Sequence, residues 1–248
     1  PAIVTGGASG LGEACVRALR IRGAAVTILD MDVERGERVA EETGARFTAT
    51  DVTSDESVAA ALAHAAQAHG PARIAISCAG IAPAMKTAGS KGAHDMALFE
   101  KVVAVNLSGT MRVMSQAAQA MRGLEPLDTD GCRGAIVNTA SVAAYEGQMG
   151  QAAYAASKGG VAALTLPAAR DLSRDGIRVC AIAPGTFGTP MLKGLPDEVQ
   201  ASLAEQVPFP PRLGEPAEFA RLACFLIETG YMNGTVVRID GAIRMGVK

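Results

Sequence analysis

The chain has 248 residues, of which 49% are hydrophobic and 19% are charged, a balance that permits a sizeable core and argues against intrinsic disorder. Its formal net charge is −2 and its lysines and arginines are scattered, so we expect no nucleic-acid partner. Glycine, proline or charged residues interrupt each apolar run before it reaches the length of a membrane span, so we expect no membrane association.

Short β-type segments alternate along the chain with longer helical patterns. The predicted strands cover residues 2–5, 25–30, 46–50, 73–79, 134–141, 177–183 and 235–240. The predicted helices cover residues 11–22, 33–42, 54–68, 97–122, 152–173 and 215–228. The strands are nearly continuous apolar runs, as expected when helices cover both faces of a parallel sheet. We therefore predict one catalytic domain over residues 1–248, with a Rossmann-like, doubly wound, seven-stranded parallel sheet between two layers of helices.

A glycine-rich turn, T-G-G-A-S-G-L-G, follows the first predicted strand and opens the first helix. Its glycines permit a tight turn, a close approach of the backbone to a pyrophosphate, and close packing of helix on strand. The helix that begins there directs free N–H groups at the phosphates. The cofactor-binding residues expected in this turn are Gly6, Ser9, Gly10, Leu11 and Gly12.

An acidic residue, Asp30, ends the second predicted strand, 24 positions after Gly6. A carboxylate at this position accepts hydrogen bonds from the adenosine ribose hydroxyls of a dinucleotide. It also repels a 2′-phosphate, and the turn carries no lysine or arginine to offset that repulsion. The sequence therefore predicts NAD, rather than NADP, as the cofactor.

Ser141 ends the fifth predicted strand, and Tyr154 and Lys158 follow on the next helix with i, i+4 spacing, which places both on one helix face. An unperturbed tyrosine, with a pKa of about 10, is a poor base near neutral pH. A neighbouring ammonium and a positively charged nicotinamide both favour the phenolate. We therefore predict that Tyr154 exchanges the substrate's hydroxyl proton and that Ser141 holds the substrate oxygen.

Together these residues resemble the motifs of the short-chain dehydrogenase/reductase family, over essentially the whole chain. The matching marks, in order, are Thr5-Gly6-(x)3-Gly10-x-Gly12, Asp51-Val52, Cys78-Ala79-Gly80, Asn106, Ser141, Tyr154-(x)3-Lys158 and Pro184-Gly185. One departure is Ser77-Cys78, where most relatives have two asparagines.

The resemblance implies a catalytic set of Asn106, Ser141, Tyr154 and Lys158, in which Asn106 supports a water-mediated proton path to Lys158. It implies that Asp51 and Val52 contact the adenine, and that Lys158 also binds the nicotinamide ribose. The remaining cofactor-lining residues that it implies are Cys78, Ala79, Gly80, Tyr154, Pro184 and Gly185.

Within this family, residues 138–148, 182–185, 187–190, 207–210 and 239–245 resemble those of the type II 3-hydroxyacyl-CoA dehydrogenases. This resemblance implies the reversible, NAD-dependent oxidation of a 3-hydroxyacyl-CoA to the 3-oxoacyl-CoA, as in fatty acid metabolism, and a homotetramer. It places Phe187 and Thr189 at the nicotinamide end. The alternatives are a hydroxysteroid or other secondary alcohol as substrate, or a 3-oxoacyl carrier-protein reductase, against which Asp30 argues.

Two segments are candidates for contacts with the substrate. Residues 186–212 carry apolar side chains, among them Met191, Leu192 and Leu195, and we expect this segment to close over an apolar substrate tail. A packed helical excursion is the alternative. Gln148 is a candidate for polarising a substrate carbonyl. In the loop at 84–95, Lys86 and Lys91 are candidates for contacts with CoA phosphates, although we favour a solvated surface role.

The cysteines and histidines argue against further classes of protein. The five cysteines are widely spaced and form no C-x-x-C pair, so we expect no metal site and a reducing compartment, either a bacterial cytoplasm or a mitochondrial matrix. No targeting segment is visible. None of the three histidines stands near a candidate nucleophile, which argues against a Ser-His-Asp hydrolase. A non-catalytic NAD-binding scaffold remains the alternative from a different class, and the intact catalytic set disfavours it.

Overall fold

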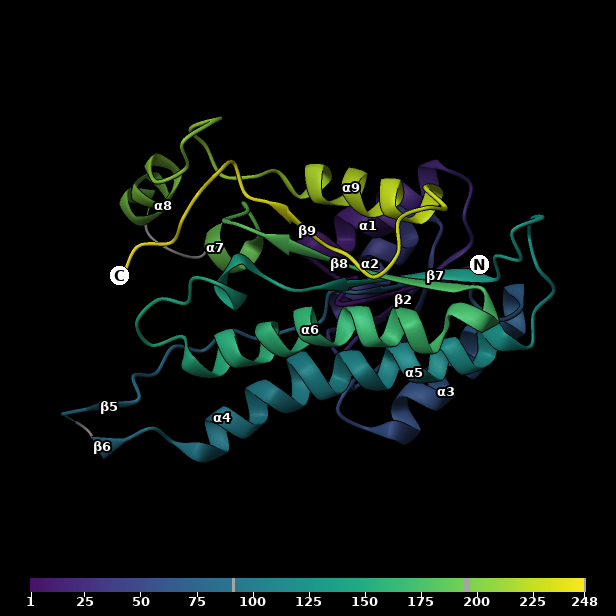
Figure 1. Ribbon diagram of the computed structural model, residues 1–248, viewed down its shortest axis with the longest axis horizontal. Coiled ribbons are helices and arrows are strands. Elements are labelled where there is room, and N and C mark those ends of the chain that lie inside the picture. The colour runs from purple at the N-terminus through teal and green to yellow at the C-terminus, as the bar shows by residue number, and fades with distance from the viewer. Residues whose placement is uncertain (91, 194–196, 248) are drawn as a thin grey trace.

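The computed structural model describes residues 1–90, 92–193 and 197–247, and it contains a seven-stranded parallel sheet in the order β3-β2-β1-β4-β7-β8-β9 (Figure 1). The strands are β1 (Ala2–Thr5), β2 (Val26–Asp30), β3 (Arg46–Ala49), β4 (Ile74–Ser77), β7 (Gly134–Thr139), β8 (Ile177–Pro184) and β9 (Val236–Ile239). All seven predicted strands are present, and each strand of this sheet pairs in parallel with its neighbours. The predicted fold class is therefore confirmed.

Helices cover both faces of the sheet (Figure 1). One layer comprises α1 (Gly10–Ile21), α2 (Val33–Thr43) and α9 (Pro216–Glu228). The other layer comprises α3 (Asp55–His69), α4 (Met96–Val103), the π-helical turn η1 (Ala104–Ser108), α5 (Gly109–Arg122) and α6 (Ala152–Asp171). Among the described residues, no helix has both the length and the hydrophobicity that a membrane span requires.

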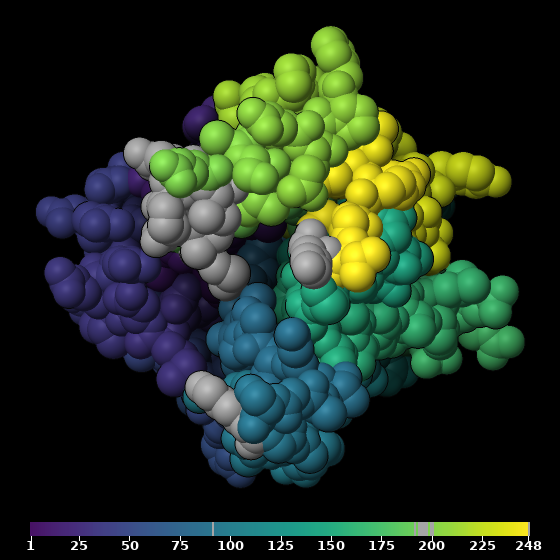
Figure 2. Space-filling view, turned by 90° about the vertical axis from the view of Figure 1, so that its left-hand side faces the viewer, coloured from purple at the N-terminus to yellow at the C-terminus, as the bar shows by residue number. Residues whose placement is uncertain are grey.

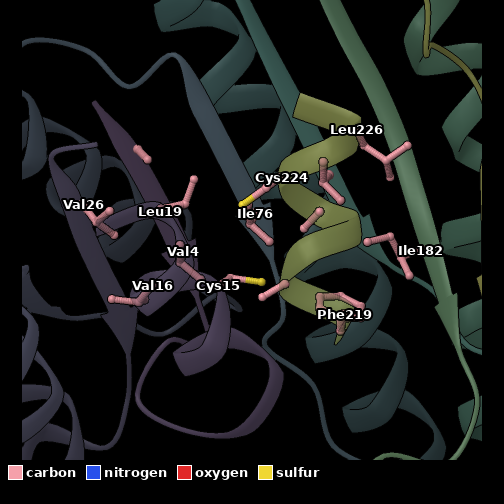
Figure 3. Packing of buried hydrophobic residues seen from close by; sticks show 14 of the residues in the cluster. Val4, Cys15, Val16, Leu19, Val26, Ile76, Ile182, Phe219, Cys224 and Leu226 are labelled. Atoms are coloured by element: carbon pink, nitrogen blue, oxygen red, sulfur yellow. The ribbon is translucent and has the colours of Figure 1, made fainter. Parts of the chain in front are cut away.

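The alternation of side chains along β1 divides the core into two layers. Val4 is buried in the cluster beneath α1 and α9, whereas its neighbour Ile3 is buried in the cluster beneath α3 and α5. Both side chains are fully buried, because successive residues of a strand point to opposite faces of the sheet. Figure 3 shows the first cluster, in which Phe219 and Leu226 of α9 pack toward the sheet. Apolar contact on both faces explains why the strands lack polar alternation.

The order of the strands places the candidate functional residues at one edge. The chain reverses direction across the sheet between β1 and β4, which are neighbours although β2 and β3 intervene in sequence. In open α/β sheets, ligands bind beyond the carboxyl ends of the strands at such a reversal. The segments that follow β1, β4, β7 and β8 therefore converge on a common site.

Several local features differ from the sequence-based prediction. The helix predicted over residues 97–122 is one helical run from Met96 to Arg122, interrupted by the π-helical turn η1. The loop at 84–95 contains a small antiparallel pair, β5 (Ala88–Gly89) and β6 (Gly92–Ala93). Residues 186–212 contain α7 (Pro190–Lys193) and α8 (Asp197–Glu205). Two 3-10 turns follow β7 and α6, namely η2 (Val142–Ala144) and η3 (Ser173–Asp175).

Candidate active site

The glycine-rich turn approaches its neighbours so closely that side chains are excluded. A Cβ on Gly12 would lie 2.1 Å from the carbonyl oxygen of Gly6, and a Cβ on Gly6 would lie 2.7 Å from the backbone nitrogen of Ala79. Helix α1 begins at Gly10, immediately after Ser9, and Leu11 packs against the core beneath it. The turn therefore exposes backbone N–H groups at a helix N-terminus, which is the geometry that binds a pyrophosphate.

Asp30 lies against this turn. One oxygen of its carboxylate accepts a hydrogen bond from the Ala8 backbone nitrogen at 3.0 Å, and the other accepts one from the Asp32 nitrogen at 3.1 Å. These two bonds fix the carboxylate beside the glycine turn while leaving it partly exposed. An ionised carboxylate has about four acceptor sites, so further hydrogen bonds to a ligand are available.

Asp51 and Val52 follow β3 at the same edge. The Oδ1 atom of Asp51 accepts hydrogen bonds from the backbone nitrogen and the hydroxyl of Thr53, at 2.8 and 2.7 Å. These two bonds lower the pKa of Asp51. Val52 is buried, its carbonyl accepts a hydrogen bond from Arg112 at 2.8 Å, and its side chain packs on Gly109. The pair is thus rigidly placed, and its contact with adenine stays a prediction.

The segment after β4 joins the glycine turn to the catalytic candidates. The backbone nitrogen of Cys78 donates to the Thr5 carbonyl at 3.1 Å, and the Ala79 nitrogen donates to the Thr5 hydroxyl at 3.3 Å. At Gly80, a Cβ would lie 3.2 Å from Oδ1 of Asn106 and 3.6 Å from Nζ of Lys158. The structure therefore brings together four of the motif segments that the sequence places far apart.

Asn106 lies within the π-helical turn η1 and is fully buried. Its Oδ1 accepts from the Ile81 nitrogen at 2.8 Å, and its Nδ2 donates to the Ile81 carbonyl at 2.9 Å and to Oγ of Ser157 at 3.0 Å. Its own carbonyl accepts from the Thr110 hydroxyl at 2.8 Å. These bonds make Asn106 a junction between the segment after β4 and the helix that carries Tyr154. The water-mediated path to Lys158 stays a prediction.

The side chain of Ser141 lies near enough to the Tyr154 phenol to influence its pKa. Ser141 directly follows β7 and caps η2 by accepting a hydrogen bond from the Ala143 nitrogen at 3.1 Å. Burial raises the pKa of the Tyr154 phenol, and Ser141 partly opposes that rise. The sequence-based argument expected Lys158 to lower this pKa. In the protein alone, desolvation outweighs the polar contact that lowers this pKa, and the lowering expected from Lys158 together with a bound nicotinamide stays a prediction.

The ammonium group of Lys158 instead bonds to the end of β7. Its Nζ donates to the Thr139 carbonyl at 2.7 Å and lies 5.9 Å from the centre of the Tyr154 ring. The side chain is buried, and burial lowers the pKa of Lys158 to about 8. The predicted i, i+4 pair thus lies on one helix face, with its lysine fixed from the side of the sheet.

Pro184 and Gly185 end β8 where it pairs with β9. The Gly185 nitrogen donates to the Ile239 carbonyl at 3.0 Å, and a Cβ on Gly185 would lie 2.9 Å from that of Asp240. Thr189 lies beside the glycine turn, because a Cβ on Gly10 would be 3.4 Å from it. The motif after β8 therefore faces the turn after β1 across the same edge.

Phe187 follows β8 at the same edge of the sheet. Its ring is buried in the core cluster, edge-on to Phe219 with 6.3 Å between ring centres, and it packs on Gly214. An apolar ring is stabilised by this burial. Its contact with the nicotinamide end stays a prediction.

Figure 2 shows a hollow on one face of the molecule, bordered by yellow-green residues around α8 and by blue residues that precede α4. Gln148 is partly exposed, and its side-chain oxygen accepts from Gln151 at 3.4 Å. The side chain of Lys86 is exposed. Lys91, Leu195 and the side chain of Met191 lie outside the described residues.

Three functional candidates were missed by the motif analysis. The Ser157 hydroxyl accepts a hydrogen bond from Asn106 and donates one to the Tyr154 carbonyl at 2.7 Å. Thr139 holds Lys158, and its hydroxyl also donates to the Cys78 sulfur at 3.4 Å. Among the described residues, the buried hydroxyl of Thr186 has no hydrogen-bond partner, which fits a polar ligand at this edge. The position of Ser157, one residue before Lys158, was the only available signal in the sequence.

Known proteins are similar to this chain over nearly its whole length. A family model described as Enoyl-(Acyl carrier protein) reductase matches residues 6–243. The 3-hydroxyacyl-CoA dehydrogenase type-2 of Bos taurus is 52% identical over 248 residues, covering 98% of this chain and 95% of that relative. The (3R)-3-hydroxyacyl-CoA dehydrogenase of Homo sapiens is 36% identical, with 98% and 95% covered. The crystal structure of 3-hydroxyacyl-CoA dehydrogenase type-2 from Mycobacterium avium aligns with a TM-score of 0.94 and 47% identity, covering 100% of this chain and 96% of that one.

Proposed function

The chain belongs to the short-chain dehydrogenase/reductase family, and on that basis we propose that it oxidises 3-hydroxyacyl-CoA thioesters reversibly to 3-oxoacyl-CoA with NAD. The observation that carries this proposal is the partly buried Tyr154 phenol, near Ser141 and one helical turn from Lys158. These groups lie at the sheet edge that also carries the glycine turn. That turn and the hydroxyl of Thr186, which has no hydrogen-bond partner in the described part of the chain, fit a nicotinamide dinucleotide, as the family implies.

Ser141 and Tyr154 have different roles in the proposed proton transfer. Ser141 donates a hydrogen bond toward the oxygen that reacts, and Tyr154 exchanges the proton of that same oxygen. Because burial raises its pKa, Tyr154 is a phenol at neutral pH, the form that protonates the oxygen when a ketone is reduced. When bound, NAD supplies the hydride acceptor and a positive charge that favours the phenolate needed for oxidation. Lys158 places a further cationic group near the same ring.

Asp30 supports NAD over NADP. Its carboxylate is held beside the glycine turn by the Ala8 and Asp32 nitrogens, where a dinucleotide would place its adenosine ribose. At this position an anion favours ribose hydroxyls and opposes a 2′-phosphate. The same argument disfavours an NADPH-dependent reductase of carrier-protein thioesters.

The substrate is proposed from the relatives, because two of them are named for 3-hydroxyacyl-CoA oxidation and cover nearly the whole chain. A hydroxysteroid or another secondary alcohol is the second candidate, since the Ser141 and Tyr154 chemistry acts on any secondary alcohol that fits. Gln148, on the segment after η2, is proposed as a contact to the substrate carbonyl. A Gln148→Ala enzyme with unchanged kcat and KM would remove that role.

The decisive measurement is NADH oxidation with acetoacetyl-CoA, beside a ketosteroid and a 3-oxoacyl carrier-protein thioester. We expect turnover of the CoA thioester to be the fastest of the three. Brisk turnover of another substrate without any of acetoacetyl-CoA would overturn the substrate assignment. In the same assay, Tyr154→Phe should abolish turnover while NADH still binds, and retained turnover would overturn the mechanism.

We further propose a homotetramer in a reducing compartment, a bacterial cytoplasm or a mitochondrial matrix. The tetramer is proposed from the family resemblance, and the compartment from the free thiols of all five cysteines. Light scattering of the purified protein tests the tetramer, because a monomeric mass at micromolar concentration would contradict it.

A further inference from the structure

Arg112 of α5 makes two hydrogen bonds to the turn that follows β3, on which Asp51 and Val52 are predicted to contact the adenine. Its guanidinium donates to the Val52 carbonyl at 2.8 Å and to Oδ1 of Asp55 at 2.7 Å. In the chain, 60 and 57 positions separate Arg112 from these two partners. The sequence motifs do not include this arginine, so its two bonds to a predicted cofactor-binding turn indicate a role that the motifs do not assign.

One face of α5 lies against this turn. Helices α3 and α5 are neighbours on the same side of the sheet (Figure 1). Gly109, Arg112 and Gln116 are spaced i, i+3 and i+7, which places them on one helix face. A Cβ on Gly109 would lie 2.8 Å from Cγ2 of Val52, and the Gln116 amide donates to the Asp55 carbonyl at 3.3 Å. The backbone of α5 therefore approaches the turn closely, and Arg112 lies between two further contacts.

The two bonds of Arg112 differ in strength. The side chain of Asp55 is 72% exposed, so water screens its ion pair with Arg112, and such pairs contribute little to stability. The side chain of Arg112 is only 20% exposed, and Val52 is buried. A hydrogen bond from a charged donor to the carbonyl of a buried residue is stronger than a neutral one. The bond to Val52 is therefore the one that holds the turn.

The turn presents the carboxylate of Asp51 to a ligand. The bonds from Thr53 both end on Oδ1, so Oδ2 can accept from another donor. The exocyclic amino group of adenine is such a donor, whereas hypoxanthine has a carbonyl oxygen at the same position. The Thr53 bonds lower the pKa of Asp51, and the positive charge of Arg112 acts in the same direction. Asp51 is thus kept as an anion, which attracts an amino group and repels a carbonyl oxygen.

We propose that Arg112 is a positioning residue for the cofactor, which holds the turn after β3 so that Asp51 selects adenine over hypoxanthine. Arg112 acts through the Val52 carbonyl rather than by contact with the base. The inference rests on the proposed dinucleotide site. Its measurable consequence is the selectivity ratio, defined as the dissociation constant of reduced nicotinamide hypoxanthine dinucleotide divided by that of NADH. A general loss of structure weakens both ligands and leaves this ratio unchanged, whereas a displaced turn weakens NADH more.

The test measures the selectivity ratio by fluorescence titration of the full-length wild type, Arg112→Met and Arg112→Gln. In the wild type, the ratio should be at least about tenfold, as expected for one hydrogen bond to a charged group. Both variants remove the bond to Val52, so NADH affinity should fall by about tenfold and the ratio to below about threefold. Circular dichroism verifies that each variant is folded.

Two further variants are controls, and both should keep the selectivity ratio of the wild type. Arg122→Met removes another arginine of α5, which pairs with Asp175 instead. Asp55→Asn removes the exposed partner of Arg112 and leaves the bond to Val52 in place. A wild-type ratio in Arg112→Met or Arg112→Gln would overturn the proposal. So would a ratio that falls as far in Arg122→Met or Asp55→Asn as in the Arg112 variants.

Arg112→Lys decides the question if neither Arg112 variant folds. A lysine ammonium keeps the charge but does not reproduce the planar fork that makes the two bonds, so the selectivity ratio should fall to an intermediate value. An unchanged ratio in Arg112→Lys would then overturn the proposal. Equal binding of both dinucleotides by the wild type would overturn it whatever the variants show. A wild type that binds neither dinucleotide would overturn the proposed function itself, so the two failures are distinguishable.

Discussion

Asn106 and Ser157 are joined by a buried hydrogen bond of 3.0 Å from Nδ2 to Oγ, although 51 residues separate them in the chain. Both side chains are fully buried. Ser157 in turn donates to the carbonyl of Tyr154 at 2.7 Å. The bond therefore couples the π-helical turn η1 to the first turn of the helix that carries the acid/base. π-helical turns often occur at functional sites, and here the irregularity coincides with a side chain whose bonds span two elements.

The first prediction is that this bond is energetically coupled. Asn106→Ala and Ser157→Ala should each lower the free energy of unfolding by about 1–3 kcal/mol, since each leaves a buried polar group unpaired. The double variant should show a coupling energy of about 0.5–3 kcal/mol in urea unfolding. Thr165→Val is the matched control, because Thr165 is also buried on α6 but bonds to the Val161 carbonyl. Coupling of Asn106 to Ser157 no larger than to Thr165 would refute the link.

The second prediction concerns cofactor choice at Asp30. Asp30→Asn keeps an oxygen that can accept from the Ala8 nitrogen but removes the negative charge. The KM for NAD should rise by about tenfold to 100-fold, as expected for losing hydrogen bonds to a charged group worth about 1.5–3 kcal/mol, and the KM for NADP should fall. Glu37→Gln removes an exposed charge from α2 and serves as the control. Unchanged selectivity in Asp30→Asn would remove the carboxylate from the ribose site.

The order and type of the main elements were predictable because the parallel sheet is covered on both faces. Each strand is then a short apolar run, and the glycine turn and the motifs at Asp51, Cys78, Ser141 and Pro184 lie at or just after strand ends, so the converging edge follows from topology. The π-helical turn was not predictable, because residues 104–108 carry the same apolar periodicity as the helix around them. The two helices within 186–212 correspond to the helical excursion that was the alternative for this segment, and the apolar residues alone did not decide between that alternative and closure over a substrate.

The residues of the site could be predicted from the sequence, but their contacts and the effect of burial on their pKa values could not. The i, i+4 spacing places Tyr154 and Lys158 together, yet it does not reveal that Lys158 bonds to Thr139 or that desolvation raises the pKa of Tyr154. The packing of Phe187 on Phe219 was likewise not predictable, since the sequence does not tell a ring that faces a ligand from one that packs in the core. Burial depends on tertiary packing, which periodicity within one element does not report.

The third prediction concerns the tight turn at Gly12. Alanine normally favours a helix over glycine, but a Cβ here would lie 2.1 Å from the Gly6 carbonyl oxygen, which belongs to the rigid backbone. Gly12→Ala should therefore lower the free energy of unfolding by roughly 1–3 kcal/mol and weaken NADH binding. At Gly230, by contrast, a Cβ meets no described atom within 4 Å, so Gly230→Ala should change stability by less than about 0.5 kcal/mol. Equal effects of the two variants in thermal and urea unfolding would contradict the steric argument.

The fourth prediction follows from the burial of Lys158, which lowers its pKa from 10.5 to about 8. Below pH 8 both the folded and the unfolded chain carry the proton, and the cost of burying the charge is present in full. Between pH 8 and 10.5 only the unfolded chain holds it, so unfolding takes up a proton. The contribution of this group to stability should therefore become more favourable with rising pH, by on the order of 3 kcal/mol across that window.

Two measurements check this expectation. In wild-type protein with ¹³C-labelled lysine, the ε-carbon resonance that is missing from Lys158→Met should titrate with a midpoint near pH 8. The difference in unfolding free energy between the wild type and Lys158→Met should change in favour of the wild type as the pH rises above 8, because only the wild type sheds a buried charge there. Lys101→Met, which removes an exposed lysine on α4, should give a curve parallel to that of the wild type. A Lys158 midpoint close to 10.5, with parallel curves for both variants, would show that the ammonium is solvated and that its bond to Thr139 does not bury its charge.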